Sequence, residues 1–119
     1  MRLLETPPDG VEAKIHASLP AGEDVLVRVW TDLDADGQFR KSWFVATPER
    51  TVIVPEEAAD GIVETPFGDI QSVKTEALVG GGRLEIECLA KPTILLPYSS
   101  SMTDKFAEVA RGLEQLRKG

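Results

Sequence analysis

The chain places several short strand-like segments ahead of a single long amphipathic segment at its C-terminal end. From Thr103 to Lys118, apolar side chains recur at helical spacing and form one stripe. Such a stripe is stable only when it packs against another layer of structure. The order therefore predicts a mainly β fold, a small barrel-like or sandwich-like β module closed by the C-terminal helix. The side chains expected to face inward are Phe106, Val109, Ala110, Leu113 and Leu116.

The length of 119 residues fits one domain. We expect an N-terminal segment at residues 1–22, the barrel at 23–98 and the helix at 102–118. The stretch from Asp9 to Leu19 is compatible with a helix or a strand, because its apolar residues recur at every fourth and also at every second position. Its alanine, glutamate and lysine content favours a short helix, and Asp9 and Glu12 have the spacing of a capping box.

The clearest predicted strand runs from Glu23 to Leu33, followed by a three-residue hairpin loop at 35–37. This loop length pairs Trp30 with Ser42 and Asp32 with Arg40. It predicts that one face, with Phe39, Trp43, Val45 and the valines at 25, 27 and 29, is the core face. The opposite face then carries Trp30 and Phe44, with Leu26 nearby. Exposed aromatic pairs often mark interfaces, so Trp30, Phe44 and Leu26 are the predicted partner-contact residues; the alternative is that a neighbouring segment covers them.

Five further segments are predicted as strands, separated by turns at Thr47–Arg50, Gly80–Gly82 and Lys91–Pro92. The irregular alternation in the segment Asp69–Val79 predicts a bulge or a change of face. The predicted strands are Thr51–Val54, Ile62–Phe67, Asp69–Val79, Arg83–Leu89 and Thr93–Tyr98.

The charge balance and the single cysteine limit the partners and the compartment. A net charge of −7 repels phosphate, which disfavours nucleic acid and phosphoinositide headgroups as partners. No apolar run approaches the ~20 residues of a membrane helix, so we expect no direct membrane insertion. Cys88 is the single cysteine, which favours the cytoplasm.

No motif predicts catalysis, a metal or a cofactor. Asp32 to Gly37 begins like a calcium loop, but position twelve is Trp43 instead of a glutamate, so a polar hairpin tip is the favoured interpretation. His16 and Cys88 lie in different segments and predict a surface imidazole and a small buried side chain. The serines at 99–101 are explained by helix capping.

Several segments resemble bacterial PH-like domains. They are Trp43–Arg50, Val52–Val54, Gly68–Val73 and Gly82–Glu87. Three others resemble a soluble region at the N-terminus of some bacterial ABC exporters: Thr31–Phe39, Leu78–Gly82, and Tyr98–Ser101 with Phe106–Arg111. The resemblance covers Gly22–Lys118 and implies a PH-like fold, in which seven antiparallel strands in two roughly orthogonal sheets form a partly open barrel capped by the C-terminal helix.

The resemblance implies a non-catalytic interaction or regulatory module, the cytoplasmic N-terminal domain of an ABC exporter's ATP-binding protein. Its partners would be the remainder of that transporter, another protein or a second copy, at the cytoplasmic face of the inner membrane. Any ATPase activity would lie in a part of the parent protein outside this chain. The alternative is a free-standing β-barrel that binds a small ligand.

Overall fold

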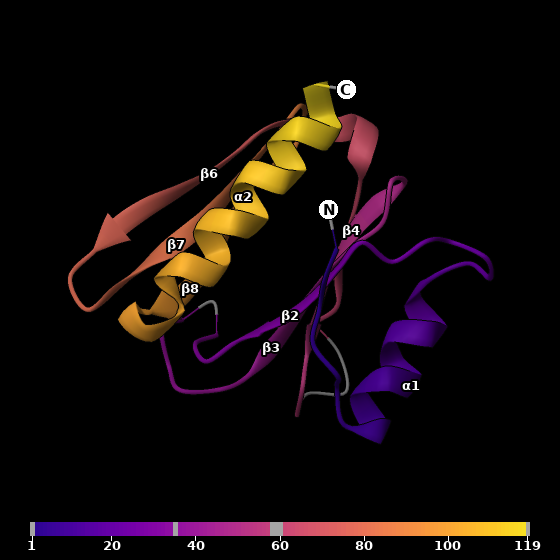
Figure 1. The fold of residues 1–119 in the computed structure, drawn as a ribbon, viewed down its shortest axis with the longest axis horizontal. Helices are drawn as coiled ribbons and strands as arrows, with labels where there is room; N and C mark the ends of the chain where they lie inside the picture. Colours follow the sequence, from indigo (N-terminus) through magenta and orange to yellow (C-terminus); the bar gives the residue numbers. More distant parts are fainter. Residues whose placement is uncertain (1, 35, 58–60, 119) are drawn as a thin grey trace.

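The computed structural model describes residues 2–34, 36–57 and 61–118. It is mainly β, with two sheets and a long C-terminal helix, as predicted (Figure 1). One sheet has five strands, in the order β1-β2-β3-β4-β5; the other has three, in the order β6-β7-β8. The strands are β1 Leu3–Leu4, β2 Val27–Thr31, β3 Ser42–Ala46, β4 Arg50–Pro55, β5 Val63–Pro66, β6 Ile70–Leu78, β7 Gly81–Cys88 and β8 Ile94–Ser99. The helices are α1 Asp9–Ser18 and α2 Thr103–Lys118, with short 3-10 turns at Phe67–Asp69 and Ser100–Met102.

All neighbouring strands are antiparallel except β1, which runs parallel to β2. No ladder among the described residues joins the two sheets, so the β-structure is two sheets and not a closed barrel. The parallel strand β1 was not predicted, because a two-residue strand leaves no periodic pattern. Its place is fixed by backbone N–H groups of Leu3 and Glu5, which donate to Leu26 and Arg28 at 2.9 and 2.7 Å.

The helical interpretation of the N-terminal segment is confirmed by α1. The capping-box prediction is wrong, because Pro8 is the N-cap residue and provides no side-chain hydrogen bond. Val11 and Ile15, four residues apart, are the buried residues of α1. They pack against β3 and β4 on one face of the five-stranded sheet, in a cluster completed by Trp43, Val45, Val52 and Val54.

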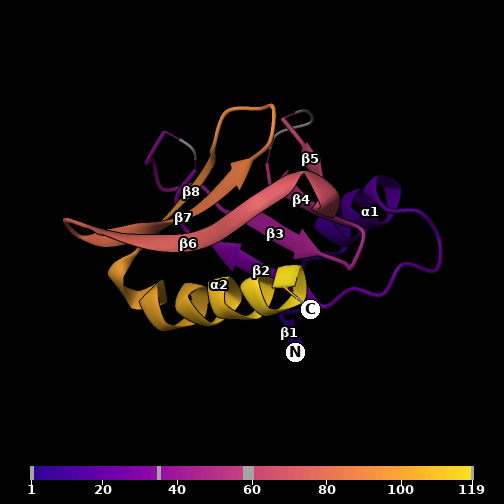
Figure 2. The same ribbon diagram turned by 90° about the horizontal axis from the view of Figure 1, so that it is seen from above.

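The opposite face of the five-stranded sheet contributes to the main core. Val27, Val29, Phe44 and Ala46 point there and meet side chains of the three-stranded sheet and of α2. Figure 2 shows the arrangement: α2 runs alongside β6, whereas α1 lies at the far side of the five-stranded sheet. The five-stranded sheet is therefore covered on both faces, which explains why every residue of β3 is buried.

The predicted register of the β2–β3 hairpin is wrong by one residue. The loop closes as predicted around Asp34 and Gln38, whose backbone N–H and C=O groups are 2.9 Å apart; residue 35 within it lies outside the described residues. Beyond the loop, however, Thr31 pairs with Ser42. Thr31 lies three residues before Asp34, whereas Ser42 lies four residues after Gln38, so the returning chain contains one extra residue. The extra residue is accommodated in a tight turn, where the N–H of Arg40 donates to Gln38 O.

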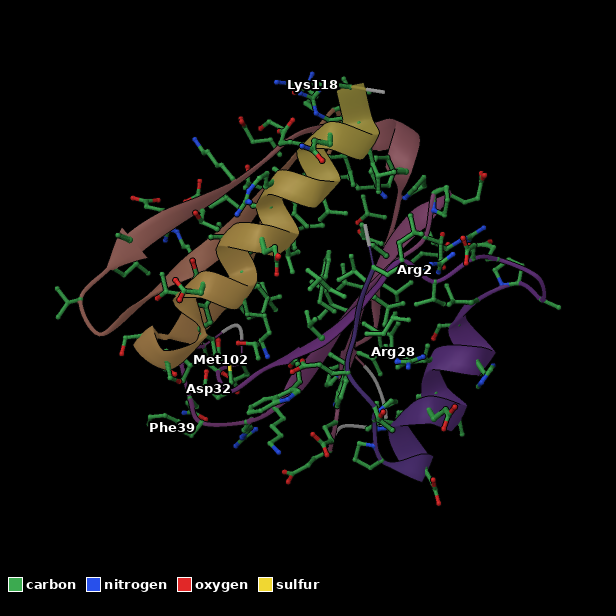
Figure 3. All side chains as sticks on the ribbon, viewed as in Figure 1. Arg2, Arg28, Asp32, Phe39, Met102 and Lys118 are labelled. Carbon is green, nitrogen blue, oxygen red and sulfur yellow. The ribbon has the colours of Figure 1, made fainter. Side chains whose placement is uncertain are left out.

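This one-residue shift exchanges the two faces of β3, because side chains alternate along a strand. Phe44 pairs with Val29 and is 0% exposed, whereas it was expected on the surface. Trp43 and Val45 face α1 and not the main core. Phe39, expected inside, is 84% exposed and lies at the periphery of the molecule (Figure 3). The expected Asp32–Arg40 pair is absent from the described ion pairs; the Arg40 guanidinium lies 3.9 Å from Asp34 instead.

The three-stranded sheet packs against α2. The ring of Phe106 stacks on that of Tyr98 with centroids 4.7 Å apart and nearly parallel planes. The predicted bulge in β6 is confirmed between Ile70 and Ser72. Just after it, the N–H of Val73 donates to the Glu114 carboxylate of α2 at 2.6 Å, which satisfies a backbone group at this edge of the sheet. Four of the five residues predicted to face inward from α2 are buried; Leu116 is 36% exposed.

The predicted turn at Gly80–Gly82 is shorter than expected, because Gly81 and Gly82 belong to β7. Gly80 has a φ of +82°, which explains glycine at the turn itself. A Cβ atom on Gly82 would lie 2.7 Å from the Tyr98 hydroxyl and 2.8 Å from Glu76 O. Glycine at position 82 therefore leaves the space that the Tyr98 side chain occupies beneath α2.

We expect Gly82→Ala to lower the free energy of unfolding by about 2 kcal/mol, because the added methyl group must displace Tyr98 or the backbone of β6. Urea unfolding followed by circular dichroism measures this. Gly10→Ala is the matched control, since a Cβ atom at position 10 meets nothing within 4 Å and alanine favours a helix. A destabilisation by Gly10→Ala equal to that by Gly82→Ala would contradict the packing explanation.

We expect Phe106→Ala to cost about 3–5 kcal/mol, because it leaves a cavity beneath Tyr98 in the main core. Leu116→Ala on the same helix should cost less than about 1 kcal/mol, since this side chain is partly exposed. Thermal unfolding of the two variants compares them. Equal losses would show that the stripe of α2 is not buried as described.

Candidate binding groove

The three predicted partner-contact residues do not form one surface. Phe44 is fully buried in the main core, so it cannot touch a partner of the folded chain. Leu26 is half-buried and packs against that same core. Trp30 pairs with Trp43 across β2 and β3 and is half-buried. A contact role for Trp30 and Leu26 therefore stays a prediction, without the aromatic pair that motivated it.

Two lysines flank the ring of Trp30. The Nζ atoms of Lys41 and Lys105 each lie 4.5 Å from its centroid, a distance at which an ammonium is attracted to an indole face. Lys105 also donates to the Trp30 carbonyl at 2.7 Å and to Glu5 at 3.1 Å. The contacts of Lys105 fix α2 to the start of the chain and to β2. The ring of Trp30 lies between the two lysines.

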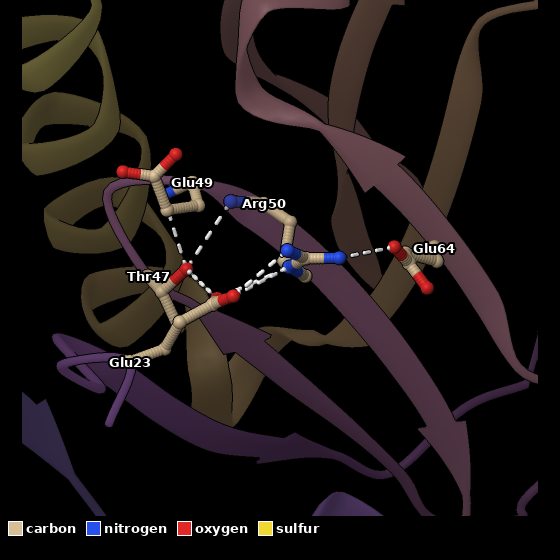
Figure 4. A network of polar contacts seen from close by, with 5 residues as sticks. All are labelled: Glu23, Thr47, Glu49, Arg50 and Glu64. Carbon is tan, nitrogen blue, oxygen red and sulfur yellow. Dashed lines mark hydrogen bonds and ion pairs between the residues drawn. The ribbon is translucent and has the colours of Figure 1, made fainter. Parts of the chain in front are cut away.

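A carboxylate pair surrounds Arg50, but its contacts are structural (Figure 4). The guanidinium donates to Glu23 at 2.8 Å and to Glu64 at 2.6 Å. Thr47 donates to Glu23 at 2.8 Å and accepts the N–H groups of Glu49 and Arg50. The hydrogen bonds from Arg50 hold the pKa of Glu23 below its usual value. The network therefore ties the predicted turn at Thr47–Arg50 to the segment before β2 and to β5.

Side chains at the end of β2 join the two sheets at one corner. Thr31 Oγ1 donates to Pro97 O at 2.6 Å. The Asp32 carboxylate accepts the N–H of Ser99 at 3.0 Å and also its hydroxyl. Burial by itself would raise the pKa of Asp32, but the hydrogen bonds from Ser99 outweigh it and hold this pKa below its usual value. Pro97 and Ser99 of β8 are thus fixed against the end of β2.

Away from this corner the sheets diverge and leave an open groove of about 890 Å³. One wall is the beginning of β8 with the residues just before it; the other is formed by β3, β4 and β5. The apolar residues lining it include Ile53, Val63, Ile94, Leu95 and Leu96. Charged side chains lie at its rim: Asp34, Asp36, Arg40, Lys41 and Glu57. This volume is in the range of ligand-binding pockets, about 300–1,000 Å³. A second hollow, beside α1, has about 260 Å³.

Sequence reasoning missed this groove. Its lining comes from segments near residues 34–42, 53–57, 61–63 and 92–96, which no local motif connects. Two weak signals were present. Val63 and Leu95 are apolar residues of edge strands whose side chains remain exposed, and Pro92 lies two residues before β8.

The described residues show no other constellation of chemistry-bearing groups. No three His, Cys, Asp or Glu side chains among them gather closely enough to hold a metal ion. Cys88 lies in the main core, where burial raises the pKa of its thiol, whereas His16 is exposed on α1 beside Glu12. Within the part of the chain that the structure describes, no helix is long and apolar enough to cross a bilayer.

No family model matches this sequence, and no curated protein matches it.

We expect Asp32→Asn to destabilise the chain at neutral pH by about 1 kcal/mol, because a charge-assisted acceptor of two Ser99 hydrogen bonds is lost. The pKa of Asp32 is lowered in the folded chain, so its carboxylate stabilises the fold above the unfolded pKa of about 4. This stabilisation is lost as the pH falls through the lowered pKa. Thermal unfolding of both proteins between pH 7 and about pH 2 should therefore show a difference that shrinks with acid.

A double-mutant cycle with Ser99→Ala is the control. If Asp32 acts through Ser99, the two losses will be less than additive. Additive losses, or a difference that is independent of pH, would contradict the pairing.

Proposed function

We propose that this chain is a non-catalytic interaction module that binds a protein partner in the groove between its two sheets. The observation that carries the proposal is the groove itself: an open, largely aliphatic cleft of about 890 Å³ beside the exposed edges of two sheets. Ligand-binding clefts are typically lined by apolar side chains with a few polar groups beside them. Lys41 reaches from the ring of Trp30 to the rim, so Trp30 lies next to the mouth and remains a candidate contact.

The proposal includes membership of the PH-like domains and a place in the N-terminal cytoplasmic region of an ABC exporter's ATP-binding protein. Its support is the order of elements: four consecutive antiparallel strands (β2 to β5), then three (β6 to β8), then α2. The partner would then be the rest of that transporter. The reading frame beyond Gly119 tests this context, which predicts membrane-spanning segments and a nucleotide-binding P-loop; a frame that encodes neither would contradict it.

A second candidate function is a free-standing protein that binds a small apolar ligand in the same groove. The volume of the groove favours this candidate, because pockets for drug-sized molecules have similar volumes. The rim offers both cations and carboxylates, so an amphiphile with an anionic head is chemically acceptable. Titration with dodecanoate tests this candidate, because a site for small apolar ligands should bind it. A site for a protein partner does not require this binding.

We expect Val63→Glu to abolish binding at the groove, because it places a carboxylate among aliphatic side chains at a position that is already 43% exposed. The probe is anilinonaphthalene sulfonate, an anionic dye whose fluorescence rises on apolar surfaces, and amide NMR shifts locate it. Leu78→Glu is the matched control: Leu78 is also 43% exposed, but it lies on β6 outside the groove. Dye shifts that spare Ile53 and Leu95, or that survive Val63→Glu, would refute the site.

A further inference from the structure

We propose that the groove receives an extended apolar segment of the partner polypeptide, flanked by lysine or arginine, which adds as a strand to the free edge of β8. This inference rests on the proposed function and specifies what occupies its site. It follows from the direction of the backbone groups of β8, from the shape of the groove and from the charges at its mouth.

The backbone groups of β8 alternate between β7 and the groove side. In an antiparallel pair, the N–H and C=O of one residue point to the same neighbour, and those of the next residue point away. Ser99 N–H donates to Asp32, and Pro97 O accepts from Thr31, so these two residues point away from β7. Ser100 N–H donates to Gly80 O, which is on the β7 side. Leu95 has the same parity as Pro97 and Ser99, so its N–H and C=O point away from β7.

Thr31 at the end of β2 and Asp32 just after it satisfy this edge at Pro97 and Ser99, but no such side chain does so at Leu95. By this alternation the ladder with β7 does not use the N–H and C=O of Leu95, and no turn, loop or inter-sheet backbone hydrogen bond among the described residues involves them. Leu95 also lines the groove, together with Thr93. A free strand edge beside an apolar cleft provides main-chain donors and acceptors next to sites for alternate side chains, which is the arrangement used to bind extended peptides. A hydrocarbon ligand would leave these backbone groups unpaired.

The groove also has room for the side chains of an added strand. Ile94 and Leu96 point to the core side of β8 and form its base, and Ile53 and Val63 on β4 and β5 form the opposite wall. Side chains of an extended peptide alternate, so every second one would pack on these aliphatic residues while the others remain in solvent. The expected segment therefore alternates apolar and polar residues.

The charges at the mouth favour basic flanks on that segment. Lys41 is held over Trp30, and the nearest carboxylate to Arg40 is Asp34. Among the described residues, Asp36 and Glu57 at the rim make no ion pair. The chain as a whole carries −7. Lysine or arginine beside the apolar residues of the peptide would complement this rim and speed association.

The test uses the full chain and a short synthetic peptide of alternating valine and threonine with a lysine at each end. We expect amide NMR shifts at Leu95, Ile53 and Val63 and an affinity that falls with added salt. Two N-methylated peptides provide the decisive comparison. In one peptide, the methyl groups replace the amide hydrogens that would pair with β8. In the other peptide, they replace the amide hydrogens that point away from β8. The first peptide should bind roughly fivefold or more weakly than the unmethylated one, and the second should bind equally well.

A variant of the chain tests the same edge. Leu95→Pro removes the N–H that points into the groove, at a strand position of the same parity as the native Pro97. This variant should lower the affinity for the peptide by roughly fivefold or more, whereas Leu95→Thr, which keeps the N–H, should not. Should Leu95→Pro fail to fold, the methylated peptides decide the question alone.

The outcomes separate the two proposals. Three results would overturn strand addition and leave the groove as a binding site. They are equal binding of both methylated peptides, dodecanoate binding without peptide binding, and concentration-dependent self-association that shifts the amide NMR signal of Leu95. Absence of shifts at the groove with the dye, dodecanoate and the peptide alike would overturn the proposed function as well.

Discussion

The packing of Phe106 on Tyr98 is the contact on which the rest of the structure depends. Their rings stack at 4.7 Å in the main core and join α2 to β8. The contact requires glycine at position 82, because any larger residue would collide with Tyr98. The same core holds Phe44, which the extra residue in the β2–β3 hairpin directs inward. Phe44, Tyr98 and Phe106 belong to one core, so a change at any of them would disturb the packing between the two sheets and α2.

This packing makes the two sides of the molecule unequal. On one side, α2 covers the core and supplies Glu114 to a backbone N–H of β6. On the other side, the sheets meet at the corner formed by Asp32 and Ser99 and then separate. Edge strands with unpaired backbone groups are prone to unwanted association unless they are covered or used. Under the proposed function the free edge at Leu95 belongs to the second case, because a partner would pair with it in the groove.

Local pattern predicted much of the fold but little of the candidate site. The bounds of α2 and the bulge after Ile70 follow from periodicity, which neighbouring residues determine. The hairpin register did not follow, because the turn near Arg40 adds a residue that no glycine or proline marks, and Phe44 was therefore placed on the wrong face. The groove arises where two sheets separate, which is a tertiary property. Its residues come from four segments, so no sequence window contained it.

Amide hydrogen exchange along β8 in the free chain tests the central claim most directly. If the N–H groups of β8 alternate as described, Ile94, Leu96 and Tyr98 will exchange slowly, since the N–H of each points toward its partner on β7 and is hydrogen-bonded there. Leu95 between them will exchange fast, because its N–H faces the open groove. Slow exchange at Leu95 without any ligand, or fast exchange at Leu96, would contradict both the register of β8 and the free edge on which the binding proposal depends.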